Sequence, residues 1–187
     1  MTERPPCDPH NPRNKEITLK AVQQILSSYG VKDPIRNPKL YRRAFVHRSY
    51  SKRDFPPDCD PAACPPGVMA IKSTSNERLE FIGDGILELV TKYYLYRRFQ
   101  KADEGFMTEK KIALVKNEHI GQLAKDIGLD KWFIMSKPQE DKNTRHNLKK
   151  LGCLFEAWIG ALFLDFNQVD STLLNSFNTP FVTGPGY

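Results

Sequence analysis

Three carboxylates stand at helical spacing near the middle of the chain. Glu77, Glu80 and Asp84 occupy positions i, i+3 and i+7, which fall on one face of an α-helix. Like charges on one helix face cost roughly a few tenths of a kcal/mol per close pair unless a cation neutralises them. Carboxylates and water are the ligands that Mg²⁺ takes in proteins. A magnesium-binding face is therefore one interpretation of this spacing.

The competing interpretation is an acidic face in contact with solvent, which is the more frequent meaning of such spacing alone. Two glycines inside the same run weigh against it, because Gly83 and Gly85 each cost a helix interior about 1 kcal/mol relative to Ala. A close approach of another backbone would account for them, and so would a helix that begins late.

A further carboxylate, Glu156, lies in the most apolar stretch of the chain, beside Phe155 and Trp158. Buried carboxylates are paired or bind a metal ion. The alternative is a residue at the rim of its helix that reaches water or pairs with Lys149 or Lys150. The residues alone leave these two interpretations evenly balanced.

Size and composition indicate one globular domain. The chain has 187 residues, of which 40% are hydrophobic and 27% charged. It has no apolar run long enough to cross a bilayer and no apolar core of a signal peptide, so we expect an intracellular, cytoplasmic protein without membrane contact. The four cysteines fit that compartment as free thiols; they are Cys7, Cys59, Cys64 and Cys153.

The charge balance suits a polyanionic partner. The formal net charge is +6, yet the acidic residues above are concentrated in one stripe. Such a stripe repels phosphates unless metal ions neutralise it. Metal-dependent cleavage of phosphodiesters needs this combination of a basic surface and an acidic cluster.

Helical periodicity without sustained alternation predicts an all-α fold. The expected helices span residues 17–29, 38–50, 76–99, 108–127 and 144–165. Thr18 and Thr108 are the expected N-caps of the first and fourth helices, which Gly30 and Gly128 end. Residues 100–107 are expected to be a connector, and residues 130–136 are too short to assign.

Two other segments are expected to lie outside the helical core. Residues 1–16 are predicted to be a flexible arm before a domain over 17–187, and residues 52–75 to be a Pro- and Cys-rich insertion. Within it, Cys59 and Cys64 reach the wide end of the spacing of a zinc half-site. No second His/Cys pair follows nearby, so plain loop thiols are the favoured interpretation. The tail to residue 187 is predicted to be loose.

Four stretches, in order along the chain, carry a resemblance to a known family. They are residues 46–50 (VHRSY), 76–85 (NERLEFIGDG), 104–108 (EGFMT) and 151–161 (LGCLFEAWIGA). The second resembles the signature of ribonuclease III, the double-stranded-RNA endonucleases that include Dicer and Drosha. The resemblance covers roughly residues 38–166.

This resemblance implies a helical, ribonuclease III-type catalytic domain that forms a homodimer. Each protomer would hold a Mg²⁺-dependent site (Mn²⁺ being an alternative), and the pair would cut both strands of an RNA duplex, leaving two-nucleotide 3′ overhangs. Of the family's four carboxylates, three fall on Glu80, Asp84 and Glu156, and the fourth, an Asp, falls on Cys153. Asp84 and Glu156 would be the main metal ligands, and Glu80 would complete the set.

Other positions would support that site. Glu104 matches an outlying acidic position and Asn117 a polar one, while Glu77 belongs to the same acidic face. Phe81 matches a residue that plugs into the partner protomer.

Cys153 is the main departure from the family pattern. A thiol is a soft ligand that suits Mg²⁺ poorly, and it removes one negative charge. A water could fill the gap with weaker metal affinity, Mn²⁺ could be preferred, or the site could be degenerate. We expect full or reduced activity and not its complete loss, because three acids remain.

Two rivals follow. One is a ribonuclease III-fold dimer that binds structured RNA without cleaving it, and the other is an unrelated helical domain with a solvated acidic face. The sequence also lacks a double-stranded-RNA-binding domain after the catalytic region, so either the chain is truncated or the catalytic dimer alone supplies RNA affinity. The insertion is atypical and resembles versions carried by large DNA viruses, which would place the protein in a host cytoplasm.

Overall fold

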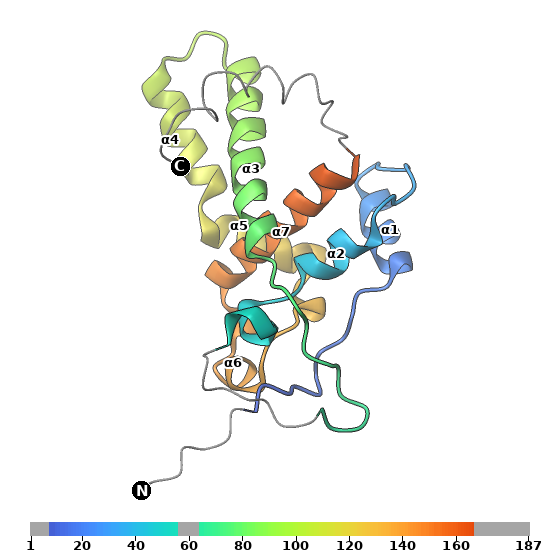
Figure 1. The fold of residues 1–187 in the computed structure, drawn as a ribbon. Coiled ribbons are helices and arrows are strands. Elements are labelled where there is room, and N and C mark those ends of the chain that lie inside the picture. Colours follow the sequence, from blue (N-terminus) through green and yellow to red (C-terminus); the bar gives the residue numbers. More distant parts are fainter. Residues whose placement is uncertain (1–7, 56–63, 167–187) are drawn as a thin grey trace, which may run out of the picture.

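The computed structural model describes residues 8–55 and 64–166, and every regular element in these ranges is a helix (Figure 1). The all-α prediction is confirmed. The α-helices are α1 (Leu19–Ser28), α2 (Pro38–Ala44), α3 (Glu77–Arg98), α4 (Glu104–Val115), α5 (Asn117–Ile127), α6 (Lys137–Asp141) and α7 (Leu148–Phe166). Short 3-10 turns span Arg48–Tyr50, Lys52–Asp54, Asp130–Trp132 and Thr144–His146.

Helix α7 is the centre of the core, as its apolar sequence predicts. It packs against α2, α3 and α5, and Figure 1 shows it running across the foot of α3. Trp158 is almost fully buried and meets Tyr41 and Phe45, with ring centroids 5.3 and 5.8 Å away. Such tilted and edge-on aromatic contacts add to the hydrophobic stabilisation of the core.

The N-terminal helices follow the expected local chemistry, with one difference in length. Thr18 caps α1 by accepting a hydrogen bond from the backbone N–H of Ala21 at 3.2 Å, and Gly30 leaves the helix at φ +83°. The helix expected over 38–50 ends at Ala44. The chain after it makes a bridge between Val46 and Ile134 and then a 3-10 turn.

The helix predicted from Thr108 to Ile127 is in fact two helices, and the first begins earlier. Asp103 caps α4, its carboxylate accepting from the backbone N–H of Phe106 at 2.8 Å, so Glu104 is helical and not part of a connector. Lys116 interrupts the run with φ −59° and ψ 131°. This extended residue lets the chain turn from α4 into α5, which ends at Gly128 as predicted.

The flexible arm expected over residues 1–16 is wrong for its described part. Asn11 is fully buried and donates to the Met135 carbonyl at 3.1 Å and to Glu140 at 3.0 Å. Asn14 donates to the same carbonyl at 2.9 Å. We call residues 8–16 the strap, because they hold the segment that leads into α7. Polar side chains that form hydrogen bonds with the backbone of another segment leave no apolar periodicity in the sequence, so analysis of hydrophobic patterns does not detect them.

Part of the insertion also packs on the domain. Met69 and Ile71 lie against a small apolar cluster that includes Tyr50 and Ile134. Residues 56–63, and the tail predicted to be loose from 167 onwards, lie outside the described residues. No helix in the described part of the chain has the length and hydropathy that a membrane span requires.

Candidate functional site

The crossing of α3 over α7 is what brings the distant acidic residues together. A methyl group added at Gly83 would lie 1.8 Å from the carbonyl oxygen of Glu156, and one added at Gly160 would lie 2.2 Å from the carbonyl oxygen of Leu79. Only glycine permits backbones to approach so closely. The expectation of a close approach holds for Gly83 but not for Gly85, around which nothing lies within 4 Å.

A second glycine crossing brings α5 to the same region. An added methyl group would lie 2.0 Å from the Leu148 carbonyl at Gly121 and 2.7 Å from the Asn117 carbonyl at Gly152. This contact places the first residue of α5 beside the turn of α7 that precedes Cys153. Three helices therefore meet at the candidate site.

Three potential ligand atoms form a tight group at this junction. One carboxylate oxygen each of Glu80 and Glu156 and the Sγ of Cys153 lie within 4.8 Å of one another. Asp84, which was expected to be a main ligand, is not one of these three residues. It lines a depression together with Glu80 and Glu156.

Glu156 is buried, which answers the question that the sequence left open. Burial, together with the negative charges of Asp84 and Glu80, raises its pKa to about 7. Its carboxylate is therefore not a rim group that reaches water. It sits among like charges, and a cation there would relieve both its desolvation and the repulsion.

Cys153 takes part in the same cluster as a neutral thiol. Burial, the hydrogen bond to Glu80 and the negative charges of Glu80 and Glu156 together raise its pKa to about 12. The thiol therefore keeps its proton at neutral pH in the metal-free protein. The side chain donates to a carboxylate where the family has another carboxylate.

The acids face an open depression of about 500 Å³, lined by Glu77, Glu80, Phe81, Asp84, Asn117 and Glu156. Six predicted site residues thus share one hollow, and Cys153 adjoins it. Glu104 does not: it lies between α3 and α4, where its carboxylate accepts from the Thr108 hydroxyl at 2.8 Å. Within this protomer it is not part of the acidic cluster.

A second hollow, of about 230 Å³, adjoins the acids and carries positive charge. Arg48 and Lys150 line it together with Glu77, Glu80 and Cys153. Arg48 pairs with Glu77 at 3.4 Å. We call Arg48 and Lys150 the basic rim. From the sequence, Lys150 was expected only as a partner for Glu156. Because Lys150 lies three residues, or one helical turn, before Cys153, the spacing could have indicated that it adjoins the acidic cluster.

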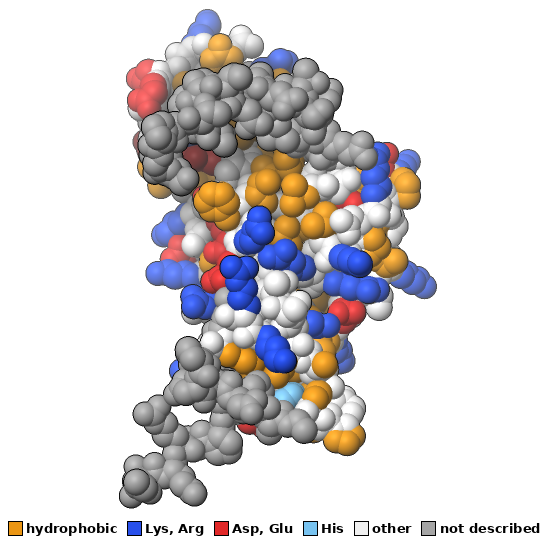
Figure 2. Space-filling view, viewed as in Figure 1, with side chains coloured by type: hydrophobic (Ala, Val, Ile, Leu, Met, Phe, Trp, Pro, Cys, Tyr) orange, Lys and Arg blue, Asp and Glu red, His pale blue; other side chains and the backbone are white. Residues whose placement is uncertain are grey.

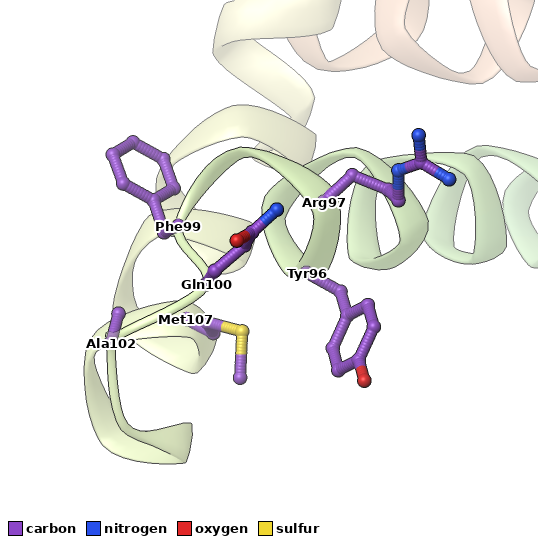
Figure 3. Close-up of a pocket in the computed structure, with 6 residues that line it drawn as sticks. All are labelled: Tyr96, Arg97, Phe99, Gln100, Ala102 and Met107. Atoms are coloured by element: carbon purple, nitrogen blue, oxygen red, sulfur yellow. The ribbon is translucent and has the colours of Figure 1, made fainter.

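A further hollow, of about 350 Å³, lies where α3 passes into α4 (Figure 3). Tyr96 and Met107 lie on one side of α3 in this view, and Arg97 on the other. No carboxylate lines it, so it offers nothing to a hard cation.

The acidic cluster fits a divalent metal ion through its oxygens. Glu80 and Glu156 come from different helices, are close enough to share one ion, and carry more negative charge than the protein neutralises. Cys153 is the weak member of the set, because a protonated thiol is a poor ligand for Mg²⁺.

Comparisons with known proteins identify the family of this chain. A family model described as Ribonuclease-III-like matches residues 37–178. The chain is 29% identical over 167 residues to a probable ribonuclease 3 of Acanthamoeba polyphaga mimivirus, covering 88% of this chain and 31% of that protein. It is 32% identical over 142 residues to ribonuclease 3 of Enterococcus faecalis, covering 76% and 55%. The chain therefore spans about a third to a half of these relatives.

Solved structures show the same fold. Two structures of the nuclease domain of ribonuclease III from Campylobacter jejuni superpose with TM-scores of 0.63 and 0.62, at 27% and 26% identity. They cover 80% and 86% of this chain, and 87% and 95% of their own. One is described as showing structural flexibility in a region involved in dimer formation.

Proposed function

This chain belongs to the ribonuclease III family, and on that premise we propose that it is a metal-dependent endoribonuclease that hydrolyses double-stranded RNA. The observation that carries the proposal is the meeting of Glu80, Cys153 and Glu156 within 4.8 Å, from helices that are far apart in the sequence. A solvated acidic face would not require a buried carboxylate among like charges.

In this proposal Glu80, Asp84 and Glu156 hold the metal ion, Mg²⁺ or Mn²⁺, and Glu77 and Asn117 line its surroundings. When bound, the ion would supply an activated water and neutralise charge on the scissile phosphate. Asp84 and Glu156 would orient that water through their carboxylate oxygens. Burial and repulsion by neighbouring carboxylates raise the pKa of Glu156. A bound cation would counter both effects, so the carboxyl group would lose its proton more readily.

The basic rim gives the RNA backbone a place to bind beside the acids. Arg48 and Lys150 are exposed and lie in the adjoining hollow, so they can contact phosphates that flank the cleaved one. Lys and Arg side chains are spread widely over the face shown in Figure 2. Contacts of this kind follow the shape of an RNA duplex and not its sequence.

Cleavage of both strands requires two sites, and α3 offers a surface for a second copy. Phe81, Leu89, Tyr93 and Tyr96 fall on one face of the helix and are 84%, 67%, 61% and 69% exposed. We propose that two copies pair through this stripe, with Phe81 entering the partner, and that their staggered cuts leave two-nucleotide 3′ overhangs.

The dimer is tested by measuring the mass in solution at the protein concentration of the cleavage assay. Wild-type protein is expected to be a dimer, and Phe81→Ala to shift it toward monomer. Tyr29→Ala removes an aromatic ring that is 67% exposed at the end of α1 and should leave the mass unchanged. A monomeric wild-type protein that cuts both strands would contradict the pairing.

The activity is tested on a long RNA duplex and on a single strand of the same sequence, with Mg²⁺ and with Mn²⁺. We expect the wild-type protein to cleave the duplex, and we expect Glu156→Gln and Asp84→Asn each to abolish this cleavage. End-mapping of the products checks the overhang. Cleavage that survives both substitutions would show that another site does the chemistry.

One observation favours a second candidate function, a dimer that binds structured RNA without cutting it. The neutral thiol of Cys153 falls at the position of a family carboxylate and lies within 4.8 Å of the carboxylate oxygens of Glu80 and Glu156. Duplex binding without cleavage in either metal would support this alternative.

A further inference from the structure

One atom of the candidate metal group differs in kind from the others. The Sγ of Cys153 and one carboxylate oxygen each of Glu80 and Glu156 lie within 4.8 Å of one another. Mg²⁺ takes oxygen ligands, so the magnesium chemistry proposed above has no use for the sulfur. Zn²⁺, in contrast, takes thiolate sulfur and carboxylate oxygen as ligands in a tetrahedral set.

The spacing of the three atoms suits a single zinc ion. Zinc binds sulfur at about 2.3 Å and carboxylate oxygen at about 2.0–2.2 Å, so two ligand atoms of one tetrahedral ion lie roughly 3.4–3.6 Å apart. The three atoms already lie within 4.8 Å of one another without an ion between them. Small rotations of the side chains would therefore place all three on one ion.

The backbone holds these side chains close to that arrangement. Cys153 and Glu156 are three residues apart in α7, so they project from the same face, one helical turn apart. Glu80 comes from α3, and the contact of Gly83 with the Glu156 carbonyl holds α3 against α7. An ion would bind without ordering a mobile segment, which favours its affinity.

Glu156 supplies independent support for a bound cation. Its side chain is only 7% exposed, and in the described part of the chain no hydrogen-bond donor or cation pairs with its carboxylate. The other charged residues that line its depression are all negative; they are Glu77, Glu80 and Asp84. A buried carboxylate without a positive partner is unfavourable, and a cation on its oxygens would remove that penalty.

We propose that Glu80, Cys153 and Glu156 bind a zinc ion, and that this ion excludes the catalytic Mg²⁺ and arrests cleavage. On binding, the Cys153 thiol releases its proton to solvent and its sulfur bonds to the ion, without oxidation or reduction. The two ions exclude each other because they share the oxygens of Glu80 and Glu156. The arrest of cleavage rests on the proposed nuclease function, whereas the binding of zinc does not.

A zinc ion in this set is unsuited to the proposed hydrolysis. Three protein ligands leave a tetrahedral ion one open position. Mg²⁺ takes an octahedral set of oxygens and usually keeps several waters, so it can hold both the attacking water and a phosphate oxygen. The tetrahedral zinc ion can hold only one of these two.

Zinc binding is tested without RNA, by titrating the metal-free full chain with Co²⁺ and then with Zn²⁺. Wild-type protein is expected to show a sulfur-to-cobalt absorption band and the strong visible bands of a tetrahedral ion, at about one ion per chain, and Zn²⁺ should remove both. Cys153→Ser and Cys153→Asp should each lose the sulfur band. Cys64→Ser removes an exposed thiol outside the cluster and should keep it. Circular dichroism checks that each variant is helical.

Inhibition is measured as the Zn²⁺ concentration that halves the cleavage rate of each protein at a fixed Mg²⁺ concentration, relative to its own rate without zinc. For Cys153→Ser this concentration should rise roughly tenfold or more, because loss of a ligand should cost at least as much as loss of a contact that supports one. For Cys64→Ser it should not change.

A sulfur band that survives in Cys153→Ser would overturn the proposal, and so would equal sensitivity of that variant and the wild-type protein to zinc. Cleavage that Zn²⁺ supports in place of Mg²⁺ would overturn the arrest. A wild-type protein that shows the sulfur band but cleaves no duplex would refute the nuclease function and support the zinc site.

Discussion

Gly83 of α3 lies directly against the backbone carbonyl of Glu156 in α7, so closely that a methyl group there would approach the oxygen to 1.8 Å. This contact determines how near Glu80 can come to Glu156. The chemistry of the candidate site therefore depends on a residue that has no side chain.

We expect Gly83→Ala to destabilise the protein by about 1–3 kcal/mol or more, because the added methyl group must force two helices apart. Cleavage should fall with it, since the acids separate. Denaturant unfolding and the duplex assay measure both effects. Gly105→Ala is the control, because the nearest atom to its added methyl group is at an ordinary 3.5 Å. Equal damage from both changes would show that the crossing is not the cause.

Cys153→Asp should lower the Mg²⁺ concentration needed for cleavage. The substitution replaces a neutral thiol by a hard, charged oxygen ligand beside Glu80 and Glu156. The midpoint of a Mg²⁺ titration of the cleavage rate reports the change. Cys153→Ser, which adds no charge, should leave that midpoint near the wild-type value. An unchanged titration for the Asp variant would mean that this side chain does not reach the ion.

Glu156 should make the stability of the metal-free protein depend on pH. Its pKa rises from 4.5 to about 7 on folding, so the folded state favours the protonated form. Stability from this group is present below pH 4.5 and is lost as pH rises through 7. Glu156→Gln should therefore stabilise the protein at pH 8, by up to about 3 kcal/mol, and have little effect at pH 4.5. Chemical denaturation in a chelator at both pH values measures this.

Magnesium supplies the control for that experiment. At position 156 a carboxylate can bind the ion, whereas the amide of Gln binds it poorly. Saturating Mg²⁺ at pH 8 should therefore stabilise the wild-type protein more than the Glu156→Gln variant. If Glu156→Gln increased the free energy of unfolding equally at both pH values, burial and repulsion of the carboxylate would not be the cause of the stabilisation.

Lys150→Ala should weaken duplex binding without preference for sequence. Loss of one phosphate contact is expected to reduce the slope of log affinity against log salt by about 1. Lys20→Ala removes an exposed lysine from α1, which contributes no residue to either hollow at the site, and is the control. Binding assays at several salt concentrations, with inactive Glu156→Gln protein, separate the two. Equal slopes for both variants would remove Lys150 from the basic rim.

Asn11→Ala should destabilise the protein by about 1–3 kcal/mol, because it removes two buried hydrogen bonds, one to the Met135 carbonyl and one to Glu140. Arg13→Ala, which removes an exposed partner of the same Glu140, should cost less than about 1 kcal/mol. The free energies of unfolding of the two variants, measured by chemical denaturation, test this difference. A harmless Asn11→Ala would mean that the strap only covers the domain and does not hold it.

The sequence by itself determined what depends on local order along the chain. Helical periodicity, the Thr18 cap and the terminating glycines are recorded in neighbouring residues, so α1, α3 and α7 could be predicted closely. The acidic residues and the family they resemble could be recognised for the same reason. The start of α4 was missed because two residues, Asp103 and Thr108, can each cap a helix, and only the backbone shows which one does.

Tertiary structure alone decided which distant residues meet. It separated Gly83, which touches another helix, from Gly85, which does not. It also grouped Cys153, and not Asp84, with Glu80 and Glu156 within 4.8 Å, and it buried Asn11 in a strap that was expected to be a loose arm. The physical reason is that burial and shared charge arise from contacts between residues far apart in the chain, and no spacing within one segment records them.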